Sequence, residues 1–174
     1  MSLTDEIKSA LDAIAAKINA IESGVIQTSN TSDTHDLNAA SPAVIPITAA
    51  VDVADAGNFS VSGNAIQCLF SGTVEVHASI HGTMAFARYL EPLNLRAQLK
   101  KNATAQKPIG CASFSNFYGE PSSTDNLDIY IHLTCAMEVA ENDLISVITY
   151  RESGIEEDIL MESGTSALIV ERIK

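Results

Sequence analysis

The sequence has no tryptophan, and its aromatic share is only 5%. A ligand pocket lined by aromatic side chains, the usual setting for a small organic cofactor, is therefore disfavoured, and we expect no cofactor. Apolar residues nevertheless make up 46% of the chain, much of it alanine, valine and isoleucine. That share is enough to bury a core, and such residues are typical of β-strands.

Basic residues are also scarce: 10 lysines and arginines stand against 22 aspartates and glutamates, which gives a formal net charge of −12. Such a surface repels phosphate groups, so nucleic acid and anionic membrane surfaces are disfavoured as partners. No apolar run in the sequence reaches the roughly 18 residues of a membrane span. Asp5 and Glu6 stand where a secretory signal would be basic, so we expect a soluble protein made in a cytoplasm.

Cysteine occurs only three times, as Cys68, Cys111 and Cys135. These residues form neither a CxxC pair nor the even set of a disulfide framework. Because Cys68 and Cys135 lie in apolar runs, we interpret them as buried free thiols. They predict no metal site and no redox chemistry.

His77 and His81 lie four residues apart in an alternating segment, which places both on one face of a strand. Residues with that spacing are about 13 Å apart, so the two cannot share one metal ion within a chain. A ring of equivalent histidines on a threefold axis is one interpretation; solvated or interface histidines are the other, and we favour it. A run of carboxylates offers calcium ligands without EF-hand spacing and is interpreted as a solvated loop: Glu152, Glu156, Glu157, Asp158 and Glu162. We predict no metal site.

Catalytic motifs are missing as well. The segment Ser163-Gly164-Thr165 lacks the G-x-S-x-G pattern, and neither a P-loop nor GxGxxG occurs in the sequence. Carboxylates are abundant enough that a glycosidase pair remains an alternative. We predict that the chain is not an enzyme.

The N-terminal segment has the period of a helix. Its apolar residues follow one another at spacings of four and three, and they form a candidate trimerisation seam: Ile7, Leu11, Ile14, Ile18, Ile21 and Val25. Isoleucine at one core position of the heptad, with leucine or isoleucine at the other, favours trimers or tetramers over dimers. We predict a coiled-coil helix over residues 1–25, ended by Gly24. The alternative is a monomeric amphipathic helix lying on the domain.

Residues 26–46 are rich in serine, threonine, asparagine and aspartate, and Pro42 and Pro46 stand at the end of the segment. This composition is typical of a linker or an extended arm that contributes nothing to a core. We predict such an arm between the helix and the following domain.

Residues 47–174 change to a period of two. Apolar and polar residues alternate over residues 74–81, 93–99 and 127–138, and apolar runs follow at 144–150 and 167–173. Short alternating segments separated by Gly, Asn and Ser turns predict an antiparallel β-sandwich. The expected fold class is therefore all-β, with a helical coiled-coil stalk at its N-terminus.

Four segments of this domain resemble a known family: residues 58–80, with the turn at Phe70-Ser71-Gly72-Thr73, and residues 95–102, 139–147 and 166–173. They are similar to trimeric jelly rolls of the complement globular-head and tumour-necrosis-factor type, and the last resembles a closing strand of bacteriophage virion proteins. Ala103 and Asn142 replace glycines of the family pattern. The resemblance implies a jelly roll assembled as a homotrimer, with a stalk at one end and loops at the other.

The leading functional hypothesis is a bacteriophage virion structural protein, made in the host cytoplasm. It would be a trimeric capsid decoration or head-fibre protein, attached to a capsid or other virion protein by its N-terminal region. A receptor-binding tail-fibre tip that recognises a host saccharide is the first alternative. A carbohydrate-active enzyme is the second. A fold used this widely does not by itself identify the function.

Overall fold

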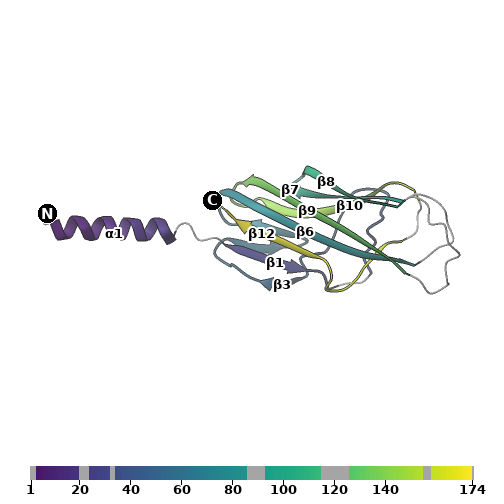
Figure 1. Cartoon of the computed structure of the whole chain (residues 1–174), viewed down its shortest axis with the longest axis horizontal. Helices are drawn as coiled ribbons and strands as arrows, with labels where there is room; N and C mark the ends of the chain where they lie inside the picture. Colours follow the sequence, from purple (N-terminus) through teal and green to yellow (C-terminus); the bar gives the residue numbers. More distant parts are fainter. Residues whose placement is uncertain are drawn as a thin grey trace.

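The computed structural model describes residues 3–19, 24–31, 34–85, 93–114, 126–154 and 158–173. One helix leads into a two-layered sandwich of antiparallel strands, and the helix projects from one end of the sandwich along its long axis (Figure 1). The predicted all-β antiparallel sandwich is confirmed.

Helix α1 (Leu3–Asn19) begins with Asp5 and Glu6 in its first turn, where carboxylates interact favourably with the positive end of the helix dipole. The side chains of residues 4–12 are all exposed, including Ile7 at 52% and Leu11 at 60%. Ile14 and Ile18 lie in the helix, but their side chains, like Ile21 as a whole, are outside the described part. No helix in the described ranges is long and apolar enough to cross a membrane.

The predicted linker over residues 26–46 is wrong, because the sandwich begins earlier. Strand β1 (Val25–Ser29) pairs with strands on both of its sides. Val25 therefore belongs to a strand and not to the heptad seam. Thr28 is fully buried, and its hydroxyl donates to the Ile47 carbonyl at 2.9 Å, so a polar residue is accommodated inside the core. Leu37 and Ile45, also within the predicted arm, are fully buried.

The first sheet, called here the β6 sheet, is centred on β6. Strands β9 and β12 pair with the same residues of β6 and so flank it on opposite sides, and β1 and β3 continue the sheet beyond β12. Its other strands are β3 (Ala50–Val53), β6 (Gly72–Ala85), β9 (Asn126–Val139), β11 (Leu160–Met161) and β12 (Ala167–Arg172).

The second sheet, the β10 sheet, has the order β4-β5-β10-β7-β8, and β2 adds to β10. Its strands are β2 (Ala43–Val44), β4 (Phe59–Ser62), β5 (Ala65–Cys68), β7 (Leu93–Lys101), β8 (Thr104–Phe114) and β10 (Leu144–Ser153). Edge strand β8 lies beside β9 of the other sheet.

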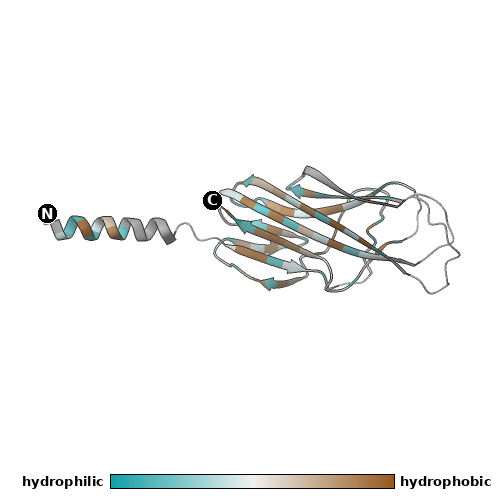
Figure 2. Cartoon of the chain, in the orientation of Figure 1, coloured by the Kyte–Doolittle hydropathy of each residue, from teal (hydrophilic) through white to brown (hydrophobic). Residues whose placement is uncertain are grey.

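The core lies between the two sheets and is built from alternate residues of each strand, as the banding in Figure 2 shows. Val76 and Ile80 of β6 face Leu95 and Val147 of the other layer, and each is at most 1% exposed. Burying one such side chain contributes about 1.5–3 kcal/mol. The period of two in the sequence therefore reports burial on one face of each strand.

Two asparagines occupy left-handed backbone positions, Asn102 with φ of 52° and Asn142 with φ of 73°. Asparagine tolerates this conformation better than other non-glycine residues, which explains how Asn142 can replace a glycine of the family pattern. The Asn102 side-chain amide donates to Asp143 at 2.7 Å, and its oxygen accepts from the Leu144 N–H at 2.8 Å. These hydrogen bonds link the turn at Asn102 to the turn at Asn142 and Asp143.

Candidate functional site

The outer face of the β6 sheet carries three of the chain's four histidines. Across the β6–β9 ladder His77 stands opposite Thr134, Ser79 opposite His132, and His81 opposite Tyr130. Directly opposite residues of paired strands share a face. We call this surface the histidine face; β12 extends it through Ala167 and Ile169, and β1 through Val25, Gln27 and Ser29. The prediction that His77 and His81 share one face is confirmed.

The middle of the histidine face is free of charged side chains in the strands described. Ser79 is flanked by His132 and Ala167, and Ile169 by His77 and Gln27. The carboxylates lie towards the ends of the face, with Glu75, Glu171 and Glu138 at one end and Asp128 at the other. Among its described strand residues none is lysine or arginine. An uncharged centre between polar ends is typical of surfaces that become buried on association.

The outer face of the β10 sheet, called here the β10 face, has a different character. Arg96, Gln98 and Lys100 of β7 point outwards, and the Arg96 guanidinium donates from Nε to Glu152 at 2.7 Å. On the neighbouring strand Ser146 and Ile148 face the same way, yet each is buried within the single chain, at 6% and 7% exposure.

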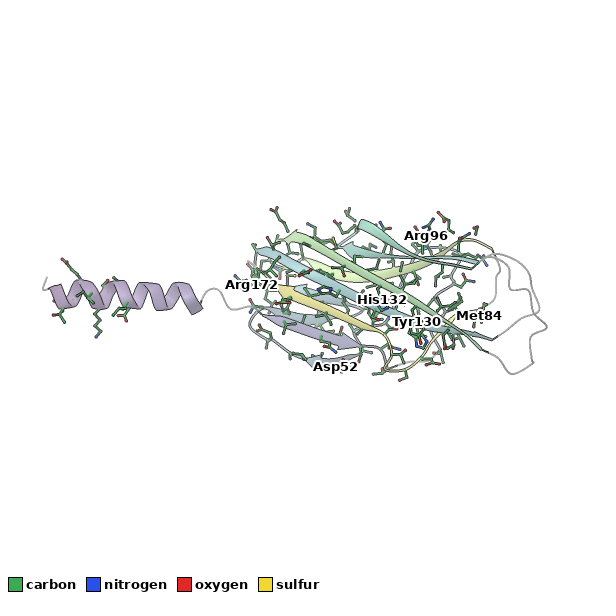
Figure 3. The ribbon with its side chains drawn as sticks, viewed as in Figure 1. Asp52, Met84, Arg96, Tyr130, His132 and Arg172 are labelled. Carbon is green, nitrogen blue, oxygen red and sulfur yellow. The ribbon has the colours of Figure 1, made fainter. Side chains whose placement is uncertain are left out.

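Tyr130 is a large side chain left uncovered on the histidine face, at 57% exposure. One side of its ring stacks on the imidazole of His81, with the centroids 4.4 Å apart and the planes 5° apart. Figure 3 shows Tyr130 and His132 on the same strand, towards the end of the sandwich away from α1. A rigid, partly exposed tyrosine of this kind is a favoured anchor in protein interfaces.

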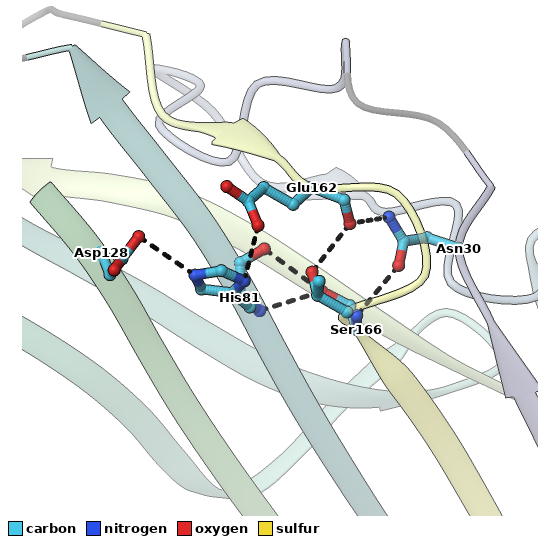
Figure 4. Close-up of polar contacts among 6 residues, drawn as sticks. Asn30, His81, Asp128, Glu162 and Ser166 are labelled. Atoms are coloured by element: carbon cyan, nitrogen blue, oxygen red, sulfur yellow. Dashed lines mark hydrogen bonds and ion pairs between the residues drawn. The ribbon is translucent and has the colours of Figure 1, made fainter. Parts of the chain in front are cut away.

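His81 is buried between two carboxylates (Figure 4). Its Nε2 lies 3.4 Å from Asp128 Oδ1, and its Nδ1 lies 3.6 Å from Glu162 Oε2. A neutral imidazole has a single N–H and can donate to one carboxylate only, whereas the protonated ring can donate to both. The arrangement is therefore complementary to a protonated His81.

A hydrogen-bond network holds the Glu162 turn against β6. Ser166 Oγ accepts from the His81 N–H at 2.9 Å and lies 3.2 Å from the His81 carbonyl, to which it donates. Asn30 donates to the Glu162 carbonyl at 2.6 Å and accepts from the Ser166 N–H at 2.9 Å. Because the Ser166 hydroxyl contacts the backbone of His81 and not its ring, the two are not arranged as a nucleophile and its base.

The other residues weighed for chemistry occupy separate places. His77 contacts Thr134 at 3.1 Å and Glu75 at 3.7 Å. Burial raises the pKa of the Cys68 thiol to about 12, with the Asp143 charge adding to the effect, so this thiol is inert at neutral pH. Within the described ranges no three His, Cys, Asp or Glu side chains are grouped to hold a metal ion. Glu156 and Glu157 lie outside those ranges.

The start of the sandwich, at Gly24, is tightly packed. Gly24 is buried, its carbonyl accepts from the Arg172 N–H at 2.8 Å, and a Cβ there would overlap the Asp55 and Asn58 side chains. The Arg172 guanidinium donates to Asn58 at 2.7 Å and lies 4.4 Å above the Phe70 ring. The glycine predicted to end the helix is thus needed for close approach, at the end of the sandwich where β12 also finishes (Figure 1).

Sequence reasoning located His77 and His81 but missed that Asp128 and Glu162 contact His81, and it missed the exposed ring of Tyr130. The register of β6 with β9 brings Asp128 and Tyr130 to His81, and the turn after β11 brings Glu162. The one signal available was Tyr130 itself, a large aromatic residue at a position of polar parity in its strand.

The strands and their order define the class of fold: an all-β sandwich resembling the tumour-necrosis-factor-like jelly roll. No model of a protein family matches the sequence, and no curated protein matches it either. Support for the expected resemblance to a jelly roll comes instead from solved structures with a similar fold.

Two proteins illustrate that similarity. Eiger TNF from S. frugiperda superposes with a TM-score of 0.54 at 12% identity, over 87% of this chain and 93% of its own. Murine APRIL, in structures at pH 5.0 and pH 8.0, superposes with a TM-score of 0.53 at 6% identity, over 87% of this chain and 99% of its own. Identities this low establish the fold alone.

Proposed function

We propose that the chain is a non-enzymatic structural protein that assembles as a homotrimer and decorates a bacteriophage particle, to which its N-terminal region attaches. The observation that carries this proposal is that exposed apolar or uncharged surface is concentrated in two places, the helix and one face of the sandwich. A helix with exposed Ile7 and Leu11 projects from one end, and one face of the sandwich presents an uncharged centre with the exposed Tyr130 beside it.

Helix α1 supports self-association because the side chains of residues 4–12 are all exposed in the single chain. Its 17 residues are close to the limit at which an isolated helix is marginal in water. Packing the seam of one copy against those of two others would bury Ile7 and Leu11 and stabilise all three helices. The isoleucine-rich heptad favours three or four chains.

The histidine face supports association of the sandwiches themselves. Its centre is small or weakly polar, so bringing two copies together strips little water from charged groups. Tyr130 offers an anchor that is already oriented by its stacking on His81. The jelly-roll resemblance implies threefold assembly, in which both surfaces would pack around a common axis. The larger area of the face would then supply most of the stability of the trimer.

The virion role is supported by the difference between the two ends of the molecule and by the sequence of the last strand, β12. The helix and the end of β12 lie at one end of the sandwich, which leaves the other end free to face outwards (Figure 1). Residues 166–173 form β12 and its flanks, and they resemble the last core strand of phage virion proteins. A location in the virion, after synthesis in the host cytoplasm, follows from this proposal.

Light scattering on the full chain tests the assembly, with an expected mass of about three times 18.5 kDa. A variant lacking residues 1–19 keeps β1 intact and should remain a folded trimer that no longer binds particles. A monomeric full chain at micromolar concentration contradicts the trimer. A truncated trimer that still binds particles contradicts attachment through the helix, and binding on a glycan array would favour the receptor-binding role.

A further inference from the structure

The histidine face is unbalanced in charge. The carboxylates on it or in contact with it are Glu75, Asp128, Glu138, Glu162 and Glu171. The groups on its strands that can supply positive charge, within the described residues, are the imidazoles of His77, His81 and His132. At one end of the face Lys101 of β7 also donates to the Glu138 carbonyl at 2.9 Å. In a trimer built on this face the carboxylates of neighbouring copies would repel one another, and the repulsion grows as water is excluded.

Two of these histidines are placed beside carboxylates. His81 lies between Asp128 and Glu162, at 3.4 and 3.6 Å, and His77 lies 3.7 Å from Glu75. His132 differs, because it has no carboxylate within ion-pair distance among the described side chains. Protonation of His81 or His77 therefore places a positive charge directly against negative ones.

The other groups around His81 do not reverse this effect. On β9 the neighbours with titratable side chains are Tyr130 and His132; β12 contributes Glu171 at its far end, and β1 contributes the uncharged Val25, Gln27 and Ser29. The segment that pairs with β11 brings His35 and Asp36, and burial lowers the pKa of His35, which favours its neutral form. With every histidine of the face protonated, its carboxylates still outnumber its cations.

We propose that the histidine face is a pH-dependent assembly surface, on which protonation of His81 and His77 strengthens the contact between copies of the chain. This inference rests on the proposed homotrimer. Histidine is the side chain whose charge ordinarily changes between pH 5 and 8. The imidazolium is the form that offsets the carboxylates which neighbouring copies bring together, so the contact between copies is stronger with these histidines protonated.

The network around His81 couples this protonation to the shape of the surface. Tyr130 stacks on the His81 ring, and the Glu162 turn is fastened to the β6 strand through Ser166 and Asn30. A protonated His81 holds Asp128 and Glu162 on both sides and so fixes the ring under Tyr130. When His81 loses that proton, one of the two carboxylates loses its hydrogen-bond donor, and its negative charge remains in the contact between copies.

The test compares the dissociation of the full-length trimer at pH 6.0 and pH 8.0 by sedimentation equilibrium. Both samples contain about 0.3 M NaCl, which screens the general effect of the net charge of −12. We expect the dissociation constant to be about tenfold or more higher at pH 8.0. H81Q should remove most of that ratio. H132Q, on the same face but away from any carboxylate, should preserve it and is the matched control.

A second variant keeps the test decisive if H81Q is poorly folded. D128N/E162Q removes the two carboxylates and leaves the imidazole, so it should associate at pH 8.0 about as tightly as the unmodified chain does at pH 6.0. A trimer with equal dissociation at both pH values, or one that loosens at pH 6.0, overturns this inference and leaves the trimer standing. An equal loss of pH dependence in H132Q overturns the assignment to His81 and His77. A monomer at both pH values overturns the proposed function instead.

Discussion

The two outer faces of the sandwich are built from the same kind of strand, but they differ in how far the single chain covers them. On the β10 face the single chain covers its own outward residues, so Ser146 and Ile148 are buried and Arg96 pairs with Glu152. On the histidine face Tyr130 and His132 remain exposed, although the strands beneath them are equally well formed. The contrast indicates that the β10 face is needed for folding and that the histidine face is available for association.

The largest effect should come from a charge on the β10 face. Replacing Ile148 by aspartate puts an unpaired carboxylate at a position that is 7% exposed. We expect the free energy of unfolding to fall by about 3–5 kcal/mol, since a buried charge without a partner is costly. Urea unfolding of the variant measures this loss. A change below about 1 kcal/mol would mean that Ile148 is not part of the folded interior.

The same charge on the histidine face should act on assembly. Tyr130→Asp changes a side chain that is already 57% exposed, so the monomer should unfold within about 0.5 kcal/mol of the unmodified chain. Three carboxylates brought together near a threefold axis should nevertheless prevent the trimer from forming. Light scattering reports the mass. Ser62→Asp, at an exposed position of β4, is the control and should remain trimeric.

A third change tests whether the helix or the histidine face contributes more to association. Ile7→Asp combined with Leu11→Asp places carboxylates in the proposed seam, where both side chains are half exposed in the single chain. We expect a trimer with a dissociation constant raised by about tenfold, because a short helical bundle adds little to the contact of the sandwiches. A variant that is wholly monomeric would reverse the ranking of the two surfaces.

The smallest effect concerns the turn between β9 and β10. The Ala140 N–H, and after it the Asn102 amide, hold the pKa of Asp143 below its usual range. A carboxyl with a lowered pKa stabilises the fold above its ordinary pKa, and that contribution is lost as the pH falls through the folded-state value. The difference in unfolding free energy between the unmodified chain and Asp143→Asn should therefore be largest near pH 7 and shrink below about pH 4. A difference that grows on acidification would contradict this account.

The fold could be predicted from the sequence to the extent that burial alternates along it. Residues 74–81 and 127–138 were assigned as strands because every second residue is apolar, and those residues form the inner faces of β6 and β9. Strand β1 was missed because Thr28 and Asn30 look like linker residues. Both are buried with hydrogen-bond partners from residues far along the chain, which composition alone does not reveal.

The site was less accessible to prediction than the fold. The position of His81 between Asp128 and Glu162 depends on a strand register and on a turn more than thirty residues from Asp128. A shift of one residue in the β6–β9 ladder would turn Tyr130 into the core. Local patterns specify which residues face outwards, and the contacts between distant strands decide which of them meet.

The placement of β1 has a mechanical consequence. Tension on α1 would reach the sandwich through Gly24 and enter a strand held on both sides, by β12 and by β3. A pull along the strand would load the β1–β12 hydrogen bonds in shear, all at once, whereas an outer strand pulled sideways would peel away bond by bond. The strand through which the chain enters the sandwich after α1 is therefore suited to bearing load.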